Sequence, residues 1–259
     1  VTKKANNRIE KEFETTQKRE MNFQYGNNTS QYTPPQFSIM PPVCKNLLII
    51  NVICYLATVV LRTRGIDLTQ WFGLHFFAAS HHHIWQWVTY AFLHGNFSHL
   101  FFNMFAVWMF GYTLENIWGA RRFIVYCLVT ILGAALLQEI TYYFMYSDLL
   151  SGVYTYVNTG YERIPVADYL NQINTIGASG MVFGLLAAFG LMFPNTTVYF
   201  YFLLPIKTKW FVIGYMVLEL FNGIVGTADG VAHFAHLGGA LAGVILLYLW
   251  KKKRDQYRY

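Results

Sequence analysis

The sequence predicts an all-α integral membrane protein, a bundle of six transmembrane helices with both termini in the cytoplasm. Three observations predict it. Of the 259 residues, 55% are hydrophobic and only 12% are charged, which is too apolar for an ordinary soluble domain. Six runs approach the roughly 20 apolar residues that cross a bilayer. The basic residues are distributed unequally between the two sides of the predicted membrane.

The six predicted spans cover about residues 43–61, 98–115, 123–146, 178–193, 209–225 and 232–250. Runs such as FIVYCLVTILGAALL offer little polar face to water, which disfavours a soluble protein with buried helices. The fourth span is short, roughly 24 Å at 1.5 Å per residue, which is less than the hydrocarbon thickness. We expect its start to lie below the outer surface beside a wet pocket, because irregular backbone at that depth must be enclosed by protein or line water.

Charge sets the orientation. With the N-terminus in the cytoplasm, 16 of the 19 lysines and arginines fall in inside segments. Only Arg62, Arg64 and Arg163 fall outside, as the positive-inside rule requires. The basic ends adjoin the first and last spans, so we interpret the net charge of +6 as contact with anionic membrane lipids and not with nucleic acid.

Three segments follow from this plan. Residues 1–40 form a polar cytoplasmic tail that is too poor in apolar residues to fold alone, residues 41–250 form the six-helix membrane domain, and residues 251–259 form a basic cytoplasmic tail. The three cysteines have no metal-ligand spacing and imply no disulfide framework. No pattern in the sequence indicates an oligomeric state.

Polar residues cluster near the external ends of the even-numbered spans. His99 and Asn103 lie in the second span, Ser179 opens the fourth within GASG, and His236 lies in the sixth. These spans enter the membrane from the same side, so the clusters share one depth range. Each has a simpler explanation alone: hydrogen bonds between helices for His99 and Asn103, close packing for the serine, and a satisfied polar contact for the histidine.

Together the clusters indicate nucleophilic catalysis. A serine hydroxyl is a weak nucleophile until a base removes its proton, and a neutral histidine within about 2.6–3.2 Å does this. Glycine pairs in the fourth and sixth spans form GxxxG faces that let the two backbones approach: Gly180 and Gly184, Gly239 and Gly243. Attack on a carbonyl creates an oxyanion, which preorganised donors stabilise. The suitable donors are the Ser179 backbone N–H, the His99 ring and the Asn103 amide.

These residues resemble the rhomboid family of intramembrane serine proteases over most of residues 40–250. The resemblance rests on HGNFSHLFFN opening the second span, GASG opening the fourth and AHLGGALAG in the sixth. It implies a six-helix rhomboid-type core with a Ser–His dyad and no essential third acid. Ser179 would then be the nucleophile and His236 the general base, while His99 and Asn103 would line the oxyanion site.

The resemblance also implies supporting residues, which are Gly177, Phe183 and His94. Phe183 stands where the family often has a tyrosine that packs on the catalytic histidine, so the ring face is kept and the hydroxyl is lost. We expect His94 to buttress the entrance to the second span and His233 to lie at the external mouth. Gln86 follows Trp85 where the family commonly has arginine, which puts in doubt a loop-anchoring role.

We therefore expect an enzyme that hydrolyses transmembrane protein substrates through an acyl-enzyme on Ser179, without a cofactor. By resemblance, its compact plan places it in a bacterial inner membrane with the site open to the periplasmic side. One alternative is a non-catalytic rhomboid-like protein that binds transmembrane clients, although both Ser179 and His236 are retained. Another is a transporter, which predicts ionisable relay groups and inverted repeats. Consecutive histidines at 81–83 do not converge on one ion, so we expect no metal site.

Overall fold

Helices form at all six predicted spans. The computed structural model describes residues 37–200, 203–226 and 232–256, so most of the predicted tail over residues 1–40 lies outside the described residues. The six helices are α2 (Pro42–Arg62), α5 (Phe97–Trp118), α6 (Ala120–Leu150), α8 (Ser179–Met192), α9 (Thr208–Val225) and α10 (His233–Gln256). Helix α10 continues beyond residue 250, so the start of the predicted basic tail is helical.

Four of the described helices are long and apolar enough to cross a membrane, namely α2, α6, α9 and α10, and α8 is a shorter apolar helix. Helix α5 is 22 residues long and carries polar residues such as His99 and Asn103. Large apolar side chains point outward, for example Val217 at 60% and Phe221 at 61% exposure on α9. Such a surface suits lipid better than water. The chain is a mostly helical membrane protein.

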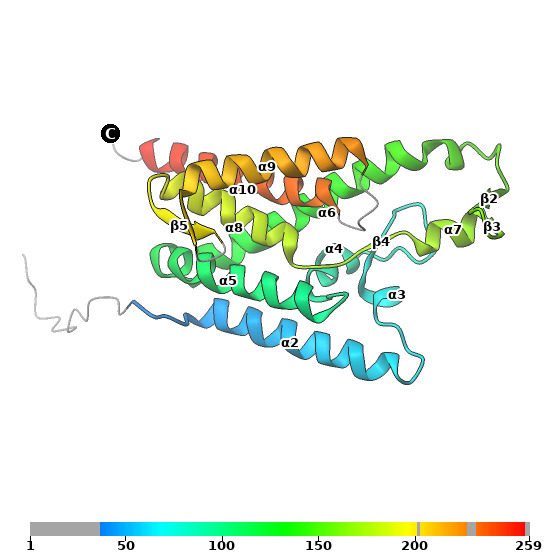
Figure 1. Ribbon diagram of the computed structural model, residues 1–259, viewed down its shortest axis with the longest axis horizontal. Helices are drawn as coiled ribbons and strands as arrows, with labels where there is room; N and C mark the ends of the chain where they lie inside the picture. Colours follow the sequence, from blue (N-terminus) through cyan, green and yellow to red (C-terminus); the bar gives the residue numbers. More distant parts are fainter. Residues whose placement is uncertain (1–36, 201–202, 227–231, 257–259) are drawn as a thin grey trace, which may run out of the picture. The chain divides into compact units, whose positions relative to one another are not determined.

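The helices run alongside one another in alternating directions (Figure 1). Helix α10 packs most extensively on α6 and α8, while α2 packs on α5, and α9 packs on α8 and α10. Because of the alternation, α5, α8 and α10 all begin toward the same end of the bundle (Figure 1). The polar residues near the starts of these three helices are therefore brought to one region.

Glycine allows α8 and α10 to touch. A Cβ on Gly239 would overlap the backbone carbonyl of Gly180, so the two helices meet there without side chains between them. The expected close approach of the fourth and sixth spans is confirmed at this pair. A Cβ on Gly243 would instead meet the Tyr126 hydroxyl of α6, which donates a hydrogen bond of 2.7 Å to the carbonyl oxygen of Gly184. The remaining two glycines thus make room for α6 as well.

Short elements form in the connections. The segment between α2 and α5 contains α3 (Thr69–Phe72), β1 (Leu74–His75), α4 (Gln86–Thr89) and the 3-10 helix η1 (Tyr90–Phe92). The segment between α6 and α8 contains β2 (Tyr156–Asn158), β3 (Arg163–Pro165), α7 (Val166–Gln172) and β4 (Asn174–Thr175). A hairpin of β5 (Thr197–Phe200) and β6 (Leu204–Lys207) precedes α9.

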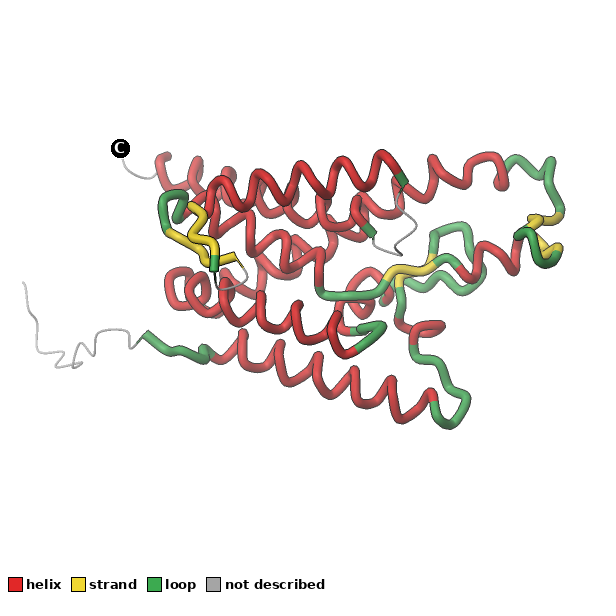
Figure 2. Tube along the Cα trace, in the orientation of Figure 1, coloured by secondary structure: helices red, strands yellow, loops and turns green. Residues whose placement is uncertain are grey.

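Within the described residues the strands form three antiparallel pairs: β1 with β4, β2 with β3, and β5 with β6; the strands are yellow in Figure 2. The β1–β4 pair matters for function because it joins the two long connections, with Leu74 opposite Thr175. Thr175 also shares a hydrogen bond of 2.7 Å with the Tyr142 hydroxyl of α6. Thr175, four residues before Ser179, is therefore held by two contacts, one to β1 and one to α6.

The first long connection is held by Gln86, which is fully buried. Its amide donates to the carbonyl oxygens of Trp71 at 3.3 Å and His81 at 2.8 Å. Its oxygen accepts from the backbone N–H groups of His75 at 3.3 Å and His83 at 3.1 Å. A neutral amide thus anchors this loop without the charge of an arginine.

Glu115 fixes the start of α2. Its two carboxylate oxygens accept the backbone N–H groups of Val43 at 2.9 Å and Cys44 at 2.7 Å. The first N–H groups of a helix have no intrahelical acceptor, and an anion there also complements the helix dipole. This buried carboxylate therefore has a structural partner away from the polar region near Ser179.

Candidate active site

Ser179 is the first residue of α8 and follows a sharp backbone turn. Gly177 has a φ of +128°, in a region that glycine adopts and other residues rarely do. The Gly177 N–H donates to the carbonyl oxygen of Tyr90 at 2.9 Å, which ties the turn to η1. Ser179 is half-buried.

His236 lies next to this hydroxyl. Its Nε2 is 2.8 Å from the Ser179 Oγ, and the imidazole is buried at 7% exposure. The Phe183 ring, one turn along α8 from the serine, stacks on the imidazole with centroids 4.3 Å apart and planes 7° apart. The ring therefore restricts the imidazole to the plane in which Nε2 faces the hydroxyl.

His99 approaches the same turn from α5. A Cβ on Gly177 would lie 2.8 Å from both Cε1 and Nε2 of His99 and 3.6 Å from the Ser179 Oγ. Only a glycine leaves room for this imidazole edge beside the serine. Asn103 is buried at 6% exposure one helical turn further along α5. His99 and Asn103 are four residues apart and therefore share one face of α5, with His99 as the member that lies beside the serine turn.

His94 supports the His99 ring. The two rings meet edge to face with centroids 5.0 Å apart, and His94 is almost completely buried. Burial, assisted by the neighbouring His99 charge, lowers the pKa of His94 to about 3. The His94 imidazole is therefore neutral at ordinary pH and packs as an aromatic ring.

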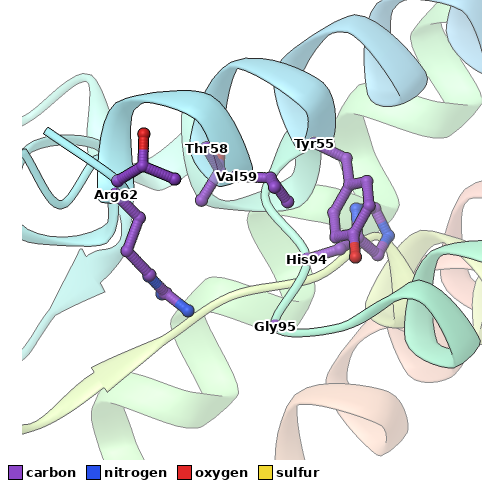
Figure 3. Close-up of a pocket in the computed structure, with 7 residues that line it drawn as sticks. Tyr55, Thr58, Val59, Arg62, His94 and Gly95 are labelled. Carbon is purple, nitrogen blue, oxygen red and sulfur yellow. The ribbon is translucent and has the colours of Figure 1, made fainter.

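A cavity of about 390 Å³ lies on the α2 side of His94 (Figure 3). Its lining consists of Tyr55, Thr58, Val59, Arg62 and Thr63 from the second half of α2 and its end, with His94 and Gly95 from the loop before α5. The volume and the polar lining suit water. Ser179, His236 and His99 do not line this cavity, but His94 does, and its ring contacts that of His99.

Two further residues, Glu219 and His233, belong to this site, although the sequence did not indicate them as site residues. The Glu219 Oε2 of α9 lies 2.8 Å from the His236 Nδ1 and 2.7 Å from the His233 Nδ1. His233, which we expected at the external mouth, is the first residue of α10, and its side chain is buried at 7% exposure beside this carboxylate. A glutamate inside a predicted span is costly in lipid, and that signal was available in the sequence.

The same three residues form a potential donor set for a metal ion. Glu219, His233 and His236 each offer a ligand atom, and these atoms all lie within 4.8 Å of one another. Two imidazoles and a carboxylate suit zinc chemically. The sequence predicted no metal site and did not anticipate this grouping.

These helices and this polar centre define a polytopic membrane protein with a serine–histidine pair inside its bundle. The Rhomboid domain matches residues 81–253, which is more than half of the chain. The chain therefore belongs to the rhomboid family.

Relatives from bacteria and eukaryotes share this region. Rhomboid protease AarA of Providencia stuartii is 25% identical over 170 residues, covering 62% of this chain and 54% of that protein. RHOMBOID-like protein 6, mitochondrial, of Arabidopsis thaliana is 26% identical over 185 residues, covering 68% and 49%. Rhomboid-like protein 11, chloroplastic, of the same plant is 28% identical over 227 residues, covering 80% and 64%. The chain thus spans about half to two thirds of the length of these relatives.

Proposed function

We propose that the protein is an intramembrane serine endopeptidase that cleaves transmembrane protein substrates through an acyl-enzyme on Ser179. The observation that carries this proposal is the 2.8 Å separation between the Ser179 Oγ and the His236 Nε2. A base at hydrogen-bond distance is what converts a serine hydroxyl into a nucleophile. Membership of a family that includes proteins named as proteases supports the proposal.

The chemistry proceeds in two steps. As the Ser179 Oγ attacks the scissile carbonyl carbon, His236 Nε2 takes the hydroxyl proton, and the tetrahedral intermediate carries a negative oxygen. When the C–N bond breaks, the imidazolium gives its proton to the leaving amine, and an ester with Ser179 remains. Water then attacks the ester with His236 again as base, which releases the new carboxyl end and restores the hydroxyl.

The oxyanion would be held where α5 meets the start of α8. The Ser179 N–H is in the first turn of α8, where N–H groups lack intrahelical acceptors and the helix dipole favours negative charge. The His99 ring edge, which lies beside Gly177, would supply one side-chain donor from α5, and the Asn103 amide one turn further along α5 would supply another. Loss of one such donor typically costs about 2.7–4 kcal/mol of barrier, or roughly 10²–10³-fold in rate.

We also propose the orientation of the bundle. All six helices would span the membrane with the basic segments inside, so that the starts of α5, α8 and α10 face the periplasm of a bacterial inner membrane. Ser179 is half-buried near that end, which suits cleavage of substrates close to the external ends of their own membrane helices. Peptide bonds at this depth become accessible where the substrate helix unwinds.

The alternative is a rhomboid protein that binds transmembrane clients without cutting them. The Ser179–His236 geometry favours the enzyme, because client binding requires no hydroxyl beside an imidazole. The Phe183 stack on His236 favours it too, since it orients a base that packing alone would not need.

Labelling with a serine-directed fluorophosphonate tests the proposal. The intact protein in detergent should be labelled, while Ser179→Ala should not be, and His236→Ala should label at least roughly 10³-fold more slowly. Cleavage of a reporter with a single membrane span, analysed with the same variants, separates a protease from a client-binding protein. Equal labelling of all three proteins, or reporter cleavage by Ser179→Ala, would refute the proposal.

A further inference from the structure

Helix α9 is the most outward-facing of the long apolar helices, yet it carries one buried carboxylate. Only 11% of its apolar stretch is buried in the protein. Among the described residues of α9, the buried ones are Thr208, at the first position of the helix, and Glu219. An ionisable group within a span is expensive unless it is paired, so its partners indicate its purpose. The partners of Glu219 are two imidazoles on α10.

The hydrogen bonds define which atom of His236 carries a proton. An ionised carboxylate only accepts, so the Nδ1 that lies 2.8 Å from the Glu219 Oε2 must be the N–H of the neutral imidazole. The other nitrogen, Nε2, then carries a lone pair, and it faces the Ser179 Oγ at 2.8 Å. This tautomer is the one that a general base requires.

We propose that Glu219 is a positioning residue that completes a Ser179–His236–Glu219 arrangement, an inference that rests on the proposed protease function. The carboxylate holds His236 in the Nδ1–H tautomer, and it stabilises the imidazolium that forms when the serine proton moves to Nε2. The nucleophile, the base and the carboxylate come from α8, α10 and α9 in turn, so the site is complete only where these three helices meet.

His233 stabilises the carboxylate in its ionised state. Its Nδ1 lies 2.7 Å from the same Oε2, and its ring is nearly perpendicular to that of His236, with an interplanar angle of 86°. Two N–H donors from successive turns of α10 thus bind one carboxylate oxygen of α9. A second donor favours the anion at this buried position.

The distances favour protons over a metal ion at this site. Zinc ligated at about 2.0–2.1 Å in a tetrahedral site holds its ligand atoms roughly 3.3–3.4 Å apart. The carboxylate oxygen is 2.7 and 2.8 Å from the two Nδ1 atoms, which are hydrogen-bond lengths. A metal on the His236 Nδ1 would also move the remaining ring proton to Nε2 and remove the base.

The test measures the fluorophosphonate labelling rate against pH. We expect Glu219→Gln to lower this rate by about 10²–10⁴-fold, because an amide is uncharged and can donate to Nδ1, which stabilises the wrong tautomer. Glu219→Asp should be labelled at least about tenfold faster than Glu219→Gln, because it keeps a carboxylate. In Glu219→Gln, the acid limb of the plot of labelling rate against pH should move to lower pH, because the negative charge that favours the imidazolium of His236 is gone. The matched control is Glu115→Gln, another buried carboxylate, which should leave the profile of the folded protein unchanged.

The pH profile has a defined set of contributors. The titratable groups among the described residues that face His236 are Ser179 on α8, Glu219 on α9, His233 on α10 and His99 on α5. The Glu219→Gln substitution removes the carboxylate and leaves the other three groups in place. A shift that appears equally in Glu115→Gln would overturn the assignment, because it would report a general loss of packing.

The outcomes separate this inference from the protease proposal. If the unmodified protein shows no Ser179-dependent labelling, the proposed function fails. If it labels and folded Glu219→Gln labels at a similar rate with the same profile, only the role of Glu219 fails. Should Glu219→Gln not fold, ¹⁵N-histidine NMR of the unmodified protein decides, since protonated Nε2 in neutral His236 would overturn the inference. Prolonged EDTA treatment should leave labelling unchanged, and a loss restored by Zn²⁺ would overturn it in favour of a metal.

Discussion

Adding one methyl group at Gly239 should disable the site without touching a polar atom. A Cβ at this position would lie 2.6 Å from the Gly180 carbonyl carbon and 3.1 Å from its Cα, whereas ordinary contacts begin near 3.4 Å. The obstacle is helix backbone, which cannot rotate away like a side chain. In Gly239→Ala, α8 and α10 must therefore separate by about 1 Å.

That separation acts directly on the Ser179–His236 pair. The Oγ to Nε2 distance of 2.8 Å would lengthen to about 3.8 Å, beyond hydrogen-bond range. A misplacement of about 1 Å typically costs around 10²-fold in rate, and overpacking typically costs about 1–3 kcal/mol of stability. We expect the labelling rate to fall about 100-fold in protein that remains folded.

The assay is fluorophosphonate labelling of detergent-purified protein, with folding monitored by thermal melting and gel filtration. The matched control is Gly214→Ala on α9, where an added Cβ meets nothing within 4 Å. This variant should label at the unmodified rate and should be as stable or slightly more stable, because alanine favours helix. Labelling of Gly239→Ala at the unmodified rate would refute the claim that close α8–α10 contact sets the distance.

Three other substitutions test the surroundings of the site. Gly177→Ala should label more slowly by at least tenfold, because a side chain at a φ of +128° is strained by about 1–3 kcal/mol and displaces the His99 ring. Glu115→Gln should destabilise the protein by about 1–3 kcal/mol in thermal or denaturant unfolding, since an amide binds the two N–H groups at the start of α2 less well. His94 should make stability depend on pH: burial holds its pKa at about 3, against about 6.5 when unfolded, so the unfolded chain binds the proton first. Stability present above about pH 6.5 should then be lost as pH falls toward 3, by at most ~5 kcal/mol, and His94→Gln should flatten that part of the melting curve against pH.

Gly177→Ala has a control variant, and the other two substitutions have outcomes that would contradict them. Gly65→Ala places a side chain at a φ of +76° with nothing within 4 Å, so it carries backbone strain without the contact to His99. It should reduce stability but not the labelling rate of folded protein. An unchanged dependence of melting on pH in His94→Gln would show that other groups govern acid unfolding. A normal stability of Glu115→Gln would show that α2 finds other acceptors for its first N–H groups.

The class of protein and the positions of its helices could be predicted from the order of the amino acids alone. Apolar length and composition depend on local residues alone, so the six helical ranges follow from the chain to within a few residues. Alternating direction then places the starts of α5, α8 and α10 together, which is why Ser179, His99 and His236 could be expected to lie close to one another without coordinates. The glycine at 239 indicated close contact because only absent side chains let two backbones meet.

The neighbours of His236, Glu219 above all, became known only from the folded arrangement of the helices. Whether Glu219 points to lipid or to the bundle depends on how α9 is rotated and on which residues of α10 lie opposite it, and the second of these is set by the packing of two helices and not by the pattern of either one. The burial of His233 depends on the same contact between α9 and α10. Cavity shape and hydrogen-bond geometry arise from elements distant in sequence, such as β1 pairing with β4 before the Ser179 turn. The pattern of residues along a helix indicates which of its faces is apolar. It does not indicate which polar atom of a neighbouring helix a side chain such as Glu219 will contact.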